Sequence, residues 1–361
     1  MKQKLTILIL LMLPFALACG GVDVPETTPE PTEIPVESVT VEEITVEITV
    51  PPTPTPTPVP TDTPEPTDTP TPEPTDTPEP TPDGLLGGRY DGFQTGEPVK
   101  TEMSYKSERV SIELSRYDSS PLTRHLVYFV ADIYIQDIEA LRTASWDGKF
   151  GTRGEKIWAP VKRMASEANA LIAINGDYYT YHPRTGLVIR NGERFAPDPW
   201  KPWKGHQILF LYRDGTVAVF ESDTFDPDAT DMSNVWQAWE FGPSLLDENG
   251  AARSKFHKAY HDIDRANPRT AIGYYEPGHY CFVVIDGRKT GYSNGLTLYE
   301  EAQLMESLGC KVAFNLDGGQ TTQLYWNEEI FNVPYDGGRS TSDIICIVEP
   351  GALQVTPESN K

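Results

Sequence analysis

Positive charge is scarce in this 361-residue sequence, which has 30 Lys and Arg against 53 Asp and Glu. A nucleic-acid partner needs clustered Lys and Arg to neutralise its phosphates, so the composition argues against one. The sequence also lacks a glycine period, a sustained heptad repeat and more than one long apolar run. These absences exclude collagen-like, coiled-coil and polytopic membrane proteins.

Cysteine is scarce as well, with four in the whole chain. The three that follow Cys19 stand in or beside apolar runs; they are Cys281, Cys310 and Cys346. An odd number does not make a disulfide framework, so buried strand thiols are expected, although one bridge remains possible in an oxidising compartment. The ligand spacing of a zinc site is absent from the sequence.

The first 19 residues read as an export signal. Lys2 and Lys4 precede an apolar run of about 13 residues, which is shorter than the roughly 20 that a membrane-spanning helix needs. The run ends in Ala-Leu-Ala-Cys-Gly, which is similar to a bacterial lipoprotein signal. We therefore expect Cys19 to be lipidated and the protein to be exported, anchored at the cell envelope and facing the extracytoplasmic side. An ordinary secretory signal with an incidental cysteine is the alternative.

Residues 20–83 are predicted to form a disordered tether. This stretch holds 18 of the 33 prolines and 15 of the 53 acidic residues, with no Lys or Arg. Thr-Pro, Glu-Pro and Thr-Asp-Thr-Pro units favour an extended, semi-rigid spacer that has no core. Residues 84–361 carry 38 acidic and 28 basic side chains, so most of the net charge of −23 belongs to the tether. They are long enough for one large domain.

Short apolar runs bounded by Gly, Pro, Asn and Asp predict the strands of this domain. The predicted ranges are 110–114, 126–135, 170–174, 186–190, 207–212, 217–220, 271–275, 279–285, 311–315, 323–326 and 344–348. Apolar residues at helical spacing predict helices over 160–169 and 298–308, with Gly309 ending the second. The pattern indicates an α+β fold, with a mixed, largely antiparallel sheet system and a few packed helices.

Polar residues just beyond a buried strand are the usual place for function, because the strand fixes them and the loop exposes them. Four segments fit this description, and they are 174–179, 267–273, 284–288 and 314–322. In the last, Asp317 is followed by two glycines and then by Thr321 and Thr322, so backbone N–H groups and a carboxylate can approach one ligand. A plain Gly-Gly hairpin turn is the alternative.

In series, these segments resemble the phosphodiester glycosidase family. The matching stretches are Ile174–Tyr179, Gly186–Gly192, Phe241–Gly250, Asn267–Gly273, Val283–Arg288, Gly295–Ala302, Asn315–Thr322 and Arg339–Val348. The resemblance covers roughly residues 105–350. It implies a hydrolase that cleaves the C1–O bond of a sugar joined through phosphate to another group. Gln320 and Thr321 stand where the family pattern has a third Gly and a Ser.

The resemblance implies roles for particular residues. An oxocarbenium-like centre needs a carboxylate as nucleophile or base, for which the catalytic candidates are Asp317, Asp177 and Glu300. Arginine pairs bidentately with phosphate oxygens, so Arg269, Arg339 and Arg288 are candidate phosphate ligands. The remaining substrate-binding candidates are Asn175, Asp286, Gly318, Gly319, Thr321 and Thr322.

Structural explanations compete with several of these roles. Glu300 would complement the dipole at a helix start, and Asp286 could belong to a hairpin turn. Arg269 could form a structural ion pair, and Asn175 could cap a turn. No cofactor is expected, although aspartates near strand ends could hold a divalent cation. The expected partner is a glycosyl-phosphate saccharide substrate. Two alternatives remain for the whole domain: a non-catalytic surface module that binds carbohydrate or phosphate, and a metal-dependent phosphodiesterase.

Overall fold

The computed structural model describes residues 86, 90–119, 125–148, 150, 158–177, 186–195 and 203–351. The predicted signal, its Cys19 and the predicted tether lie outside the described residues. Within the described residues, three sheets form, and every strand pairing in them is antiparallel. The described part of the chain contains no helix with the length and apolar character needed to cross a bilayer.

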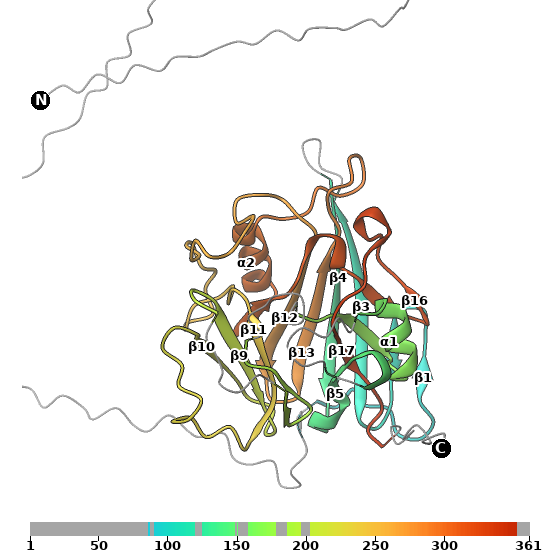
Figure 1. Cartoon of the computed structure of the whole chain (residues 1–361). Helices are drawn as coiled ribbons and strands as arrows, with labels where there is room; N and C mark the ends of the chain where they lie inside the picture. The colour runs from blue at the N-terminus through green and yellow to red at the C-terminus, as the bar shows by residue number, and fades with distance from the viewer. Residues whose placement is uncertain are drawn as a thin grey trace, which may run out of the picture. The chain divides into compact units, whose positions relative to one another are not determined.

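The largest sheet has seven strands (Figure 1). In spatial order they are β1 (Val99–Lys100), β2 (Ser104–Lys106), β3 (Val110–Ser119), β4 (Leu126–Ile135), β13 (His279–Ile285), β12 (Arg269–Glu276) and β14 (Val312–Asn315). One five-stranded sheet contains β10 (Val217–Glu221), β9 (Gln207–Tyr212), β11 (Val235–Phe241), β7 (Ile189–Arg190) and β8 (Glu193–Arg194). The other contains β16 (Glu329–Ile330), β15 (Leu324–Trp326), β6 (Ile172–Asn175), β17 (Ile344–Ile347) and β5 (Leu141–Ala144).

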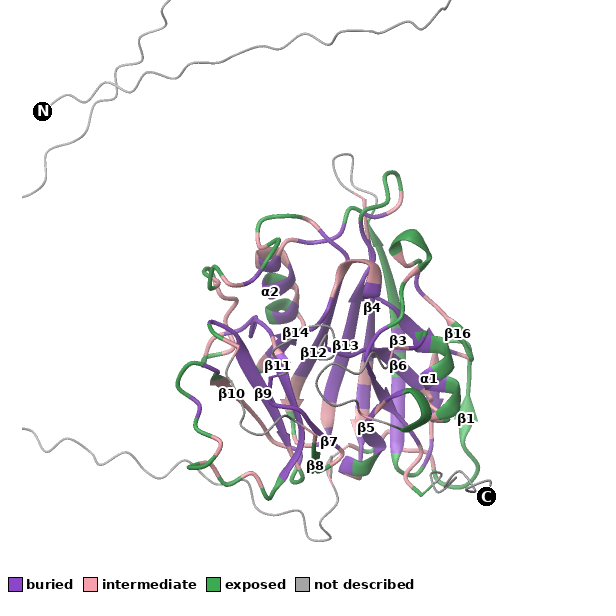
Figure 2. Ribbon diagram, viewed as in Figure 1, coloured by how far each residue is buried: buried purple, intermediate pink, exposed green. Residues whose placement is uncertain are grey.

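The three sheets share one apolar core, because successive side chains of a strand point to opposite faces. Phe282 of β13, Ile174 of β6 and Leu209 of β9 all belong to this shared core. The opposite faces of two sheets are covered by helices: α2 (Leu298–Ser307) packs against the seven-stranded sheet, and α1 (Val161–Glu167) packs against β6 and β17. Figure 2 shows the strands as largely buried and the outer face of α2 as exposed.

The expected antiparallel sheets with few helices agree with the structure, although sheet dominates more than an α+β label suggests. Every predicted strand range overlaps a strand, and both predicted helices form. The sequence pattern did not predict six strands, which are β1, β2, β5, β8, β11 and β16. Most of these have only two to four residues, and β11 is hidden by the buried polar residues Gln237 and Glu240 in its apolar pattern.

Candidate active site

The predicted polar motifs meet because antiparallel strands place the end of one strand beside the start of its neighbour. β12 begins where β13 and β14 end. In the neighbouring five-stranded sheet, β6 ends opposite the start of β17. The loops that leave these strands therefore lie at one end of the two sheets, and hydrogen bonds join them.

Asn175, the last residue of β6, connects these loops. Its Nδ2 donates to the carbonyl oxygen of Asp317 at 2.7 Å, and its Oδ1 accepts from the hydroxyl of Thr270 at 2.9 Å. The backbone N–H of Gln323 donates to the same Oδ1 at 3.2 Å. Asn175 is fully buried, so its amide holds three chain segments together and does not face solvent.

Asp317 forms an ion pair with Arg339. Arg339 Nη2 donates to Asp317 Oδ2 at 2.8 Å, and Arg339 Nε donates to the hydroxyl of Thr321. The Asp317 side chain is 11% exposed, whereas that of Arg339 is 38% exposed. Burial raises the pKa of Asp317, while Arg339 and Thr321 oppose the rise. The pair thus places a largely buried carboxylate beside the guanidinium of a partly exposed arginine side chain.

The Gly318–Gly319 turn lies close to the backbone of the 267–270 segment. A Cβ on Gly318 would come within 2.8 Å of the Pro268 carbonyl oxygen, so a side chain does not fit there. Gly319 has a φ of +66°, which favours glycine, and its N–H donates to the same carbonyl at 2.9 Å. The glycines therefore serve the close packing of two site segments.

The Arg288 side chain also lies close to this turn. Its Nε donates to Asn267 Oδ1 at 2.7 Å, and its Nη1 is 3.3 Å from the position of a Cβ on Gly319. The ring of Tyr335 lies over its guanidinium, at 5.4 Å from ring centroid to Cζ. Arg288 itself has a φ of +56°, an uncommon conformation for a residue with a side chain. Arg288 and Arg339 thus flank one glycine turn.

A second charged group, fully buried, contains Asp177, which follows Asn175 by two residues. Arg190 Nη2 donates to Asp177 Oδ2 at 2.8 Å, and Arg190 Nε donates to Asp343 Oδ2 at 2.7 Å. Burial and the neighbouring Asp177 together raise the pKa of Asp343 to about 7, against the lowering effect of Arg190. A Cβ on Gly176 would lie 2.0 Å from Asp343 Oδ1, so this cluster requires glycine there.

A sequence model of the phosphodiester glycosidases matches residues 168–348, which contain both charged groups. The chain belongs to the phosphodiester glycosidase family. It is 25% identical over 234 residues to the bovine N-acetylglucosamine-1-phosphodiester alpha-N-acetylglucosaminidase, a stretch that covers 59% of this chain and 44% of the bovine protein. It is 28% identical over 203 residues to the SPbeta prophage-derived uncharacterized protein YomE of Bacillus subtilis, covering 56% of this chain and 31% of that protein.

The chain thus spans less than half the length of these curated relatives. Its fold resembles that of the catalytic domain of the zebrafish N-acetylglucosamine-1-phosphodiester alpha-N-acetylglucosaminidase, which was solved in a form auto-inhibited by its pro-peptide. The TM-score is 0.51 at 18% identity, and the match covers 70% of this chain and 88% of that one.

In this member of the family, the guanidinium of Arg269 is turned to the protein backbone. Its Nε donates to the Leu296 carbonyl at 3.0 Å, and its Nη2 donates to the carbonyls of Asp262 and Arg265 at 2.7 and 3.1 Å. Arg269 is only 6% exposed, and burial lowers its pKa. Of the three predicted phosphate ligands, only Arg288 and Arg339 have partly exposed side chains.

Asp286 likewise uses its carboxylate inside the protein. It accepts from the hydroxyl of Tyr292 at 2.8 Å, from Asn332 Nδ2 at 2.7 Å and from the N–H of Val333 at 3.0 Å. Burial raises the pKa of Asp286, and these donors oppose the rise. The carboxylate anchors the loop that leads to Tyr335. Its contribution to the site is therefore to position this loop.

Glu300 caps α2. Its Oε2 accepts from the N–H and the hydroxyl of Thr297 at 2.8 and 2.9 Å, and its own N–H donates to Thr297 Oγ1 at 3.2 Å. This reciprocal arrangement is a capping box, which satisfies N–H groups that the first helical turn leaves unpaired. The structure therefore places the predicted catalytic Glu300 in a helix cap.

Three charged residues near the site were missed: Arg190, Asp343 and Glu301. Glu301 is fully buried on the inner face of α2, and neither carboxylate oxygen has a hydrogen-bond partner in the described part of the chain. Burial raises the pKa of Glu301 to about 8, against the effect of Arg269. Helical spacing could have found Glu301, since it stands in the apolar stripe with Leu298 and Met305.

The remaining predicted residues, Thr321 and Thr322, are fully buried in the loop. Thr321 supports Arg339, as described above, whereas the Thr322 hydroxyl has no hydrogen-bond partner among the described residues. The described residues also hold no group of three or more His, Cys, Asp or Glu arranged for a metal ion.

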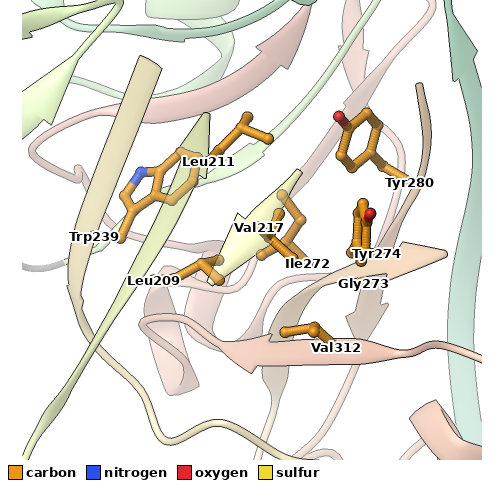
Figure 3. Close-up of a pocket in the computed structure, with 9 residues that line it drawn as sticks. All are labelled: Leu209, Leu211, Val217, Trp239, Ile272, Gly273, Tyr274, Tyr280 and Val312. Carbon is orange, nitrogen blue, oxygen red and sulfur yellow. The ribbon is translucent and has the colours of Figure 1, made fainter. Parts of the chain in front are cut away.

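An apolar cavity of about 10 Å³ lies elsewhere, in the shared core (Figure 3). Side chains of Leu209, Leu211 and Trp239 border it from one sheet, and Ile272 and Tyr280 border it from the seven-stranded sheet. None of the predicted site residues lines this cavity. It is a small packing gap in the core.

Proposed function

We propose that this chain is an exported hydrolase that cleaves the C1–O bond of a sugar-1-phosphodiester in glycans or envelope polysaccharide. The observation that carries the proposal is that Arg288 and Arg339 flank the Gly318–Gly319 turn beside Asp317. Membership of the phosphodiester glycosidase family supports the same chemistry.

The two arginines suit the phosphate. A phosphodiester carries one negative charge, and the leaving phosphate gains a second as the C1–O bond breaks. The side chains of Arg288 and Arg339 are 33% and 38% exposed, and their guanidiniums could each donate to phosphate oxygens. Their donors are held in place by Asn267 and Thr321, so little reorganisation accompanies the developing charge.

Asp317 is the proposed carboxylate at the sugar. As C1 loses its leaving group, positive charge develops on the sugar ring, and a nearby carboxylate stabilises that charge or activates water. Among the candidate carboxylates, Asp317 is the one that pairs with Arg339, an arginine proposed to bind the phosphate. Asp177, fully buried against Arg190, is proposed to support the position of the 175–177 segment.

Tyr335 is proposed to contact the sugar or the group beyond the phosphate. Its side chain lies over Arg288 and is among the exposed large apolar side chains, at 38% exposure. An aromatic ring combines a large apolar surface with a polar hydroxyl, which suits the mixed faces of a saccharide. Its loop is anchored by Asp286 through Val333.

The proposed location is the outer side of the cell envelope. The N-terminal pattern supports export and lipidation of Cys19, and the proline-rich residues 20–83 would act as a tether for a domain over 84–361. A lipid anchor and a spacer would present the site to large saccharides at the surface.

Hydrolysis of a sugar-1-phosphodiester in ¹⁸O-water tests the reaction. Label in the sugar C1 hydroxyl supports the proposed C–O cleavage, whereas label in the phosphate indicates P–O cleavage by a phosphodiesterase. The assay is run with chelator and with added Mg²⁺ or Ca²⁺, because aspartates near strand ends could hold a divalent cation. Saturable binding without any released sugar under these conditions would identify a binding module instead.

A further inference from the structure

Two of the cysteines lie side by side in the core beneath α2. Cys281 is on β13, Cys310 lies between α2 and β14, and their sulfur atoms are 3.7 Å apart. Both are buried, at 0% and 4% exposure. Cys346, the third cysteine among the described residues, belongs to a different core cluster, beneath α1.

Gly273 of β12 makes room for both sulfur atoms. A Cβ at Gly273 would come within 2.6 Å of Cys281 Sγ and 2.7 Å of Cys310 Sγ. Any larger residue would have to displace them. A disulfide is about 2.05 Å long, so bond formation requires each sulfur to move by roughly 1 Å, within the range of a small side-chain rotation.

We propose that Cys281 and Cys310 form a disulfide when the protein is in an oxidising compartment, and that this bond ties α2 and its loop to the seven-stranded sheet. The proposal does not depend on the proposed hydrolase activity. The two residues are 29 positions apart. The loop that the bond closes carries Asp286, Arg288 and Glu301, so it constrains one side of the candidate site.

The position of Cys310 gives an oxidant its point of entry. Cys310 lines a surface depression of about 480 Å³, together with Glu248, Asn249 and Lys311. The neighbouring Cys281 sulfur lowers the pKa of Cys310, which favours the reactive thiolate there. Cys281 is behind it, with no exposed surface.

The oxidant is a disulfide, either oxidised glutathione or a protein dithiol oxidase. The Cys310 thiolate attacks one oxidant sulfur, and the other oxidant sulfur leaves with the electron pair of the broken bond and takes up a proton. Cys281 then loses its proton and attacks Cys310 Sγ, which forms the Cys281–Cys310 bond and releases the second oxidant thiol. The protein loses two electrons and two protons, and the oxidant gains both.

Mass spectrometry of the full chain tests the proposal. The purified protein is incubated with oxidised glutathione, alkylated under denaturing conditions and digested without reductant. We expect a linked peptide pair joining Cys281 to Cys310, with Cys346 alkylated. Three alkylated thiols at these positions, or linkage of either residue to Cys19 or Cys346, would overturn the proposal.

Thermal unfolding gives a second, independent readout. A disulfide across this loop should raise Tm by roughly 5 °C relative to the reduced protein. Cys346→Ser is the matched control, because it removes a buried thiol and should keep the reductant-dependent shift, whereas Cys310→Ser should lose it. A reductant-dependent change in Tm of equal size in both variants would refute the Cys281–Cys310 disulfide. If a variant does not fold, the peptide analysis of the wild-type protein still tests the proposal.

Discussion

Asp317 and Arg339 are joined by a 2.8 Å ion pair at the edge of the Gly318–Gly319 turn. The two residues are 22 positions apart, and Thr321 holds the same guanidinium from a second direction. The Arg339 side chain is 38% exposed and that of Asp317 only 11%, so the arginine is the more accessible partner of the pair. The geometry suits an anionic substrate whose phosphate meets Arg339 and whose sugar lies toward Asp317.

Arg339→Lys should lower kcat/KM by about 100-fold, since an ammonium cannot hold Thr321, Asp317 and a phosphate oxygen at once. Steady-state kinetics on a sugar-1-phosphodiester measures this effect. Arg163→Lys is the matched control, because Arg163 pairs with Glu167 on the exposed face of α1. Similar kinetics in both variants would remove Arg339 from the phosphate role.

Asp317→Asn should lower kcat by at least roughly 1,000-fold while Tm changes little. Asparagine keeps the shape of the side chain. Arg339 loses its ion-pair partner, but its side chain is partly exposed, so the protein should stay folded. Binding of a non-hydrolysed phosphodiester should persist, because the arginines remain. Retained turnover would show that another carboxylate serves the sugar, with Asp177 the next candidate to substitute.

The predicted segments meet in the folded chain, and each could be found from the sequence because its signal is local. Asp317 and its glycines follow an apolar run, and the antiparallel order of β12, β13 and β14 then brings such segments together. The hydrogen-bond partners of each side chain could not be predicted in the same way. The hydrogen bonds of Arg269 go to the carbonyls of Leu296, Asp262 and Arg265, and only the folded chain shows where those carbonyls point.

The pairing of buried charged residues could not be predicted from the sequence either. Arg190 and Asp343 stand inside or beside strand patterns, and each is tolerated there because the other lies within 2.7 Å. That partner is 153 positions away. A buried ion between distant segments breaks the apolar pattern at both places without indicating which residues meet, so sequence alone did not pair them.

Glu300→Ala should destabilise the protein by about 1 kcal/mol through loss of the capping box, and kcat should change little once the protein is folded. Chemical denaturation and kinetics separate these effects. Thr297→Ala, which removes the other half of the cap, should cost a similar amount. A large fall in kcat for Glu300→Ala with no such fall for Thr297→Ala would return Glu300 to a catalytic role.

Glu301 should make stability fall as pH rises. Burial raises the pKa of Glu301 to about 8 from an ordinary 4.5, so the folded state holds a proton that the unfolded state has lost between these values. The contribution of protonated Glu301 to the free energy of unfolding is fully present below pH 4.5 and is lost progressively toward pH 8. Tm measured from pH 5 to 8 should therefore decline less steeply in Glu301→Gln than in the wild type. Glu306→Gln, on the exposed face of the same helix, should keep the wild-type slope, and equal slopes in all three proteins would contradict a buried, protonated Glu301.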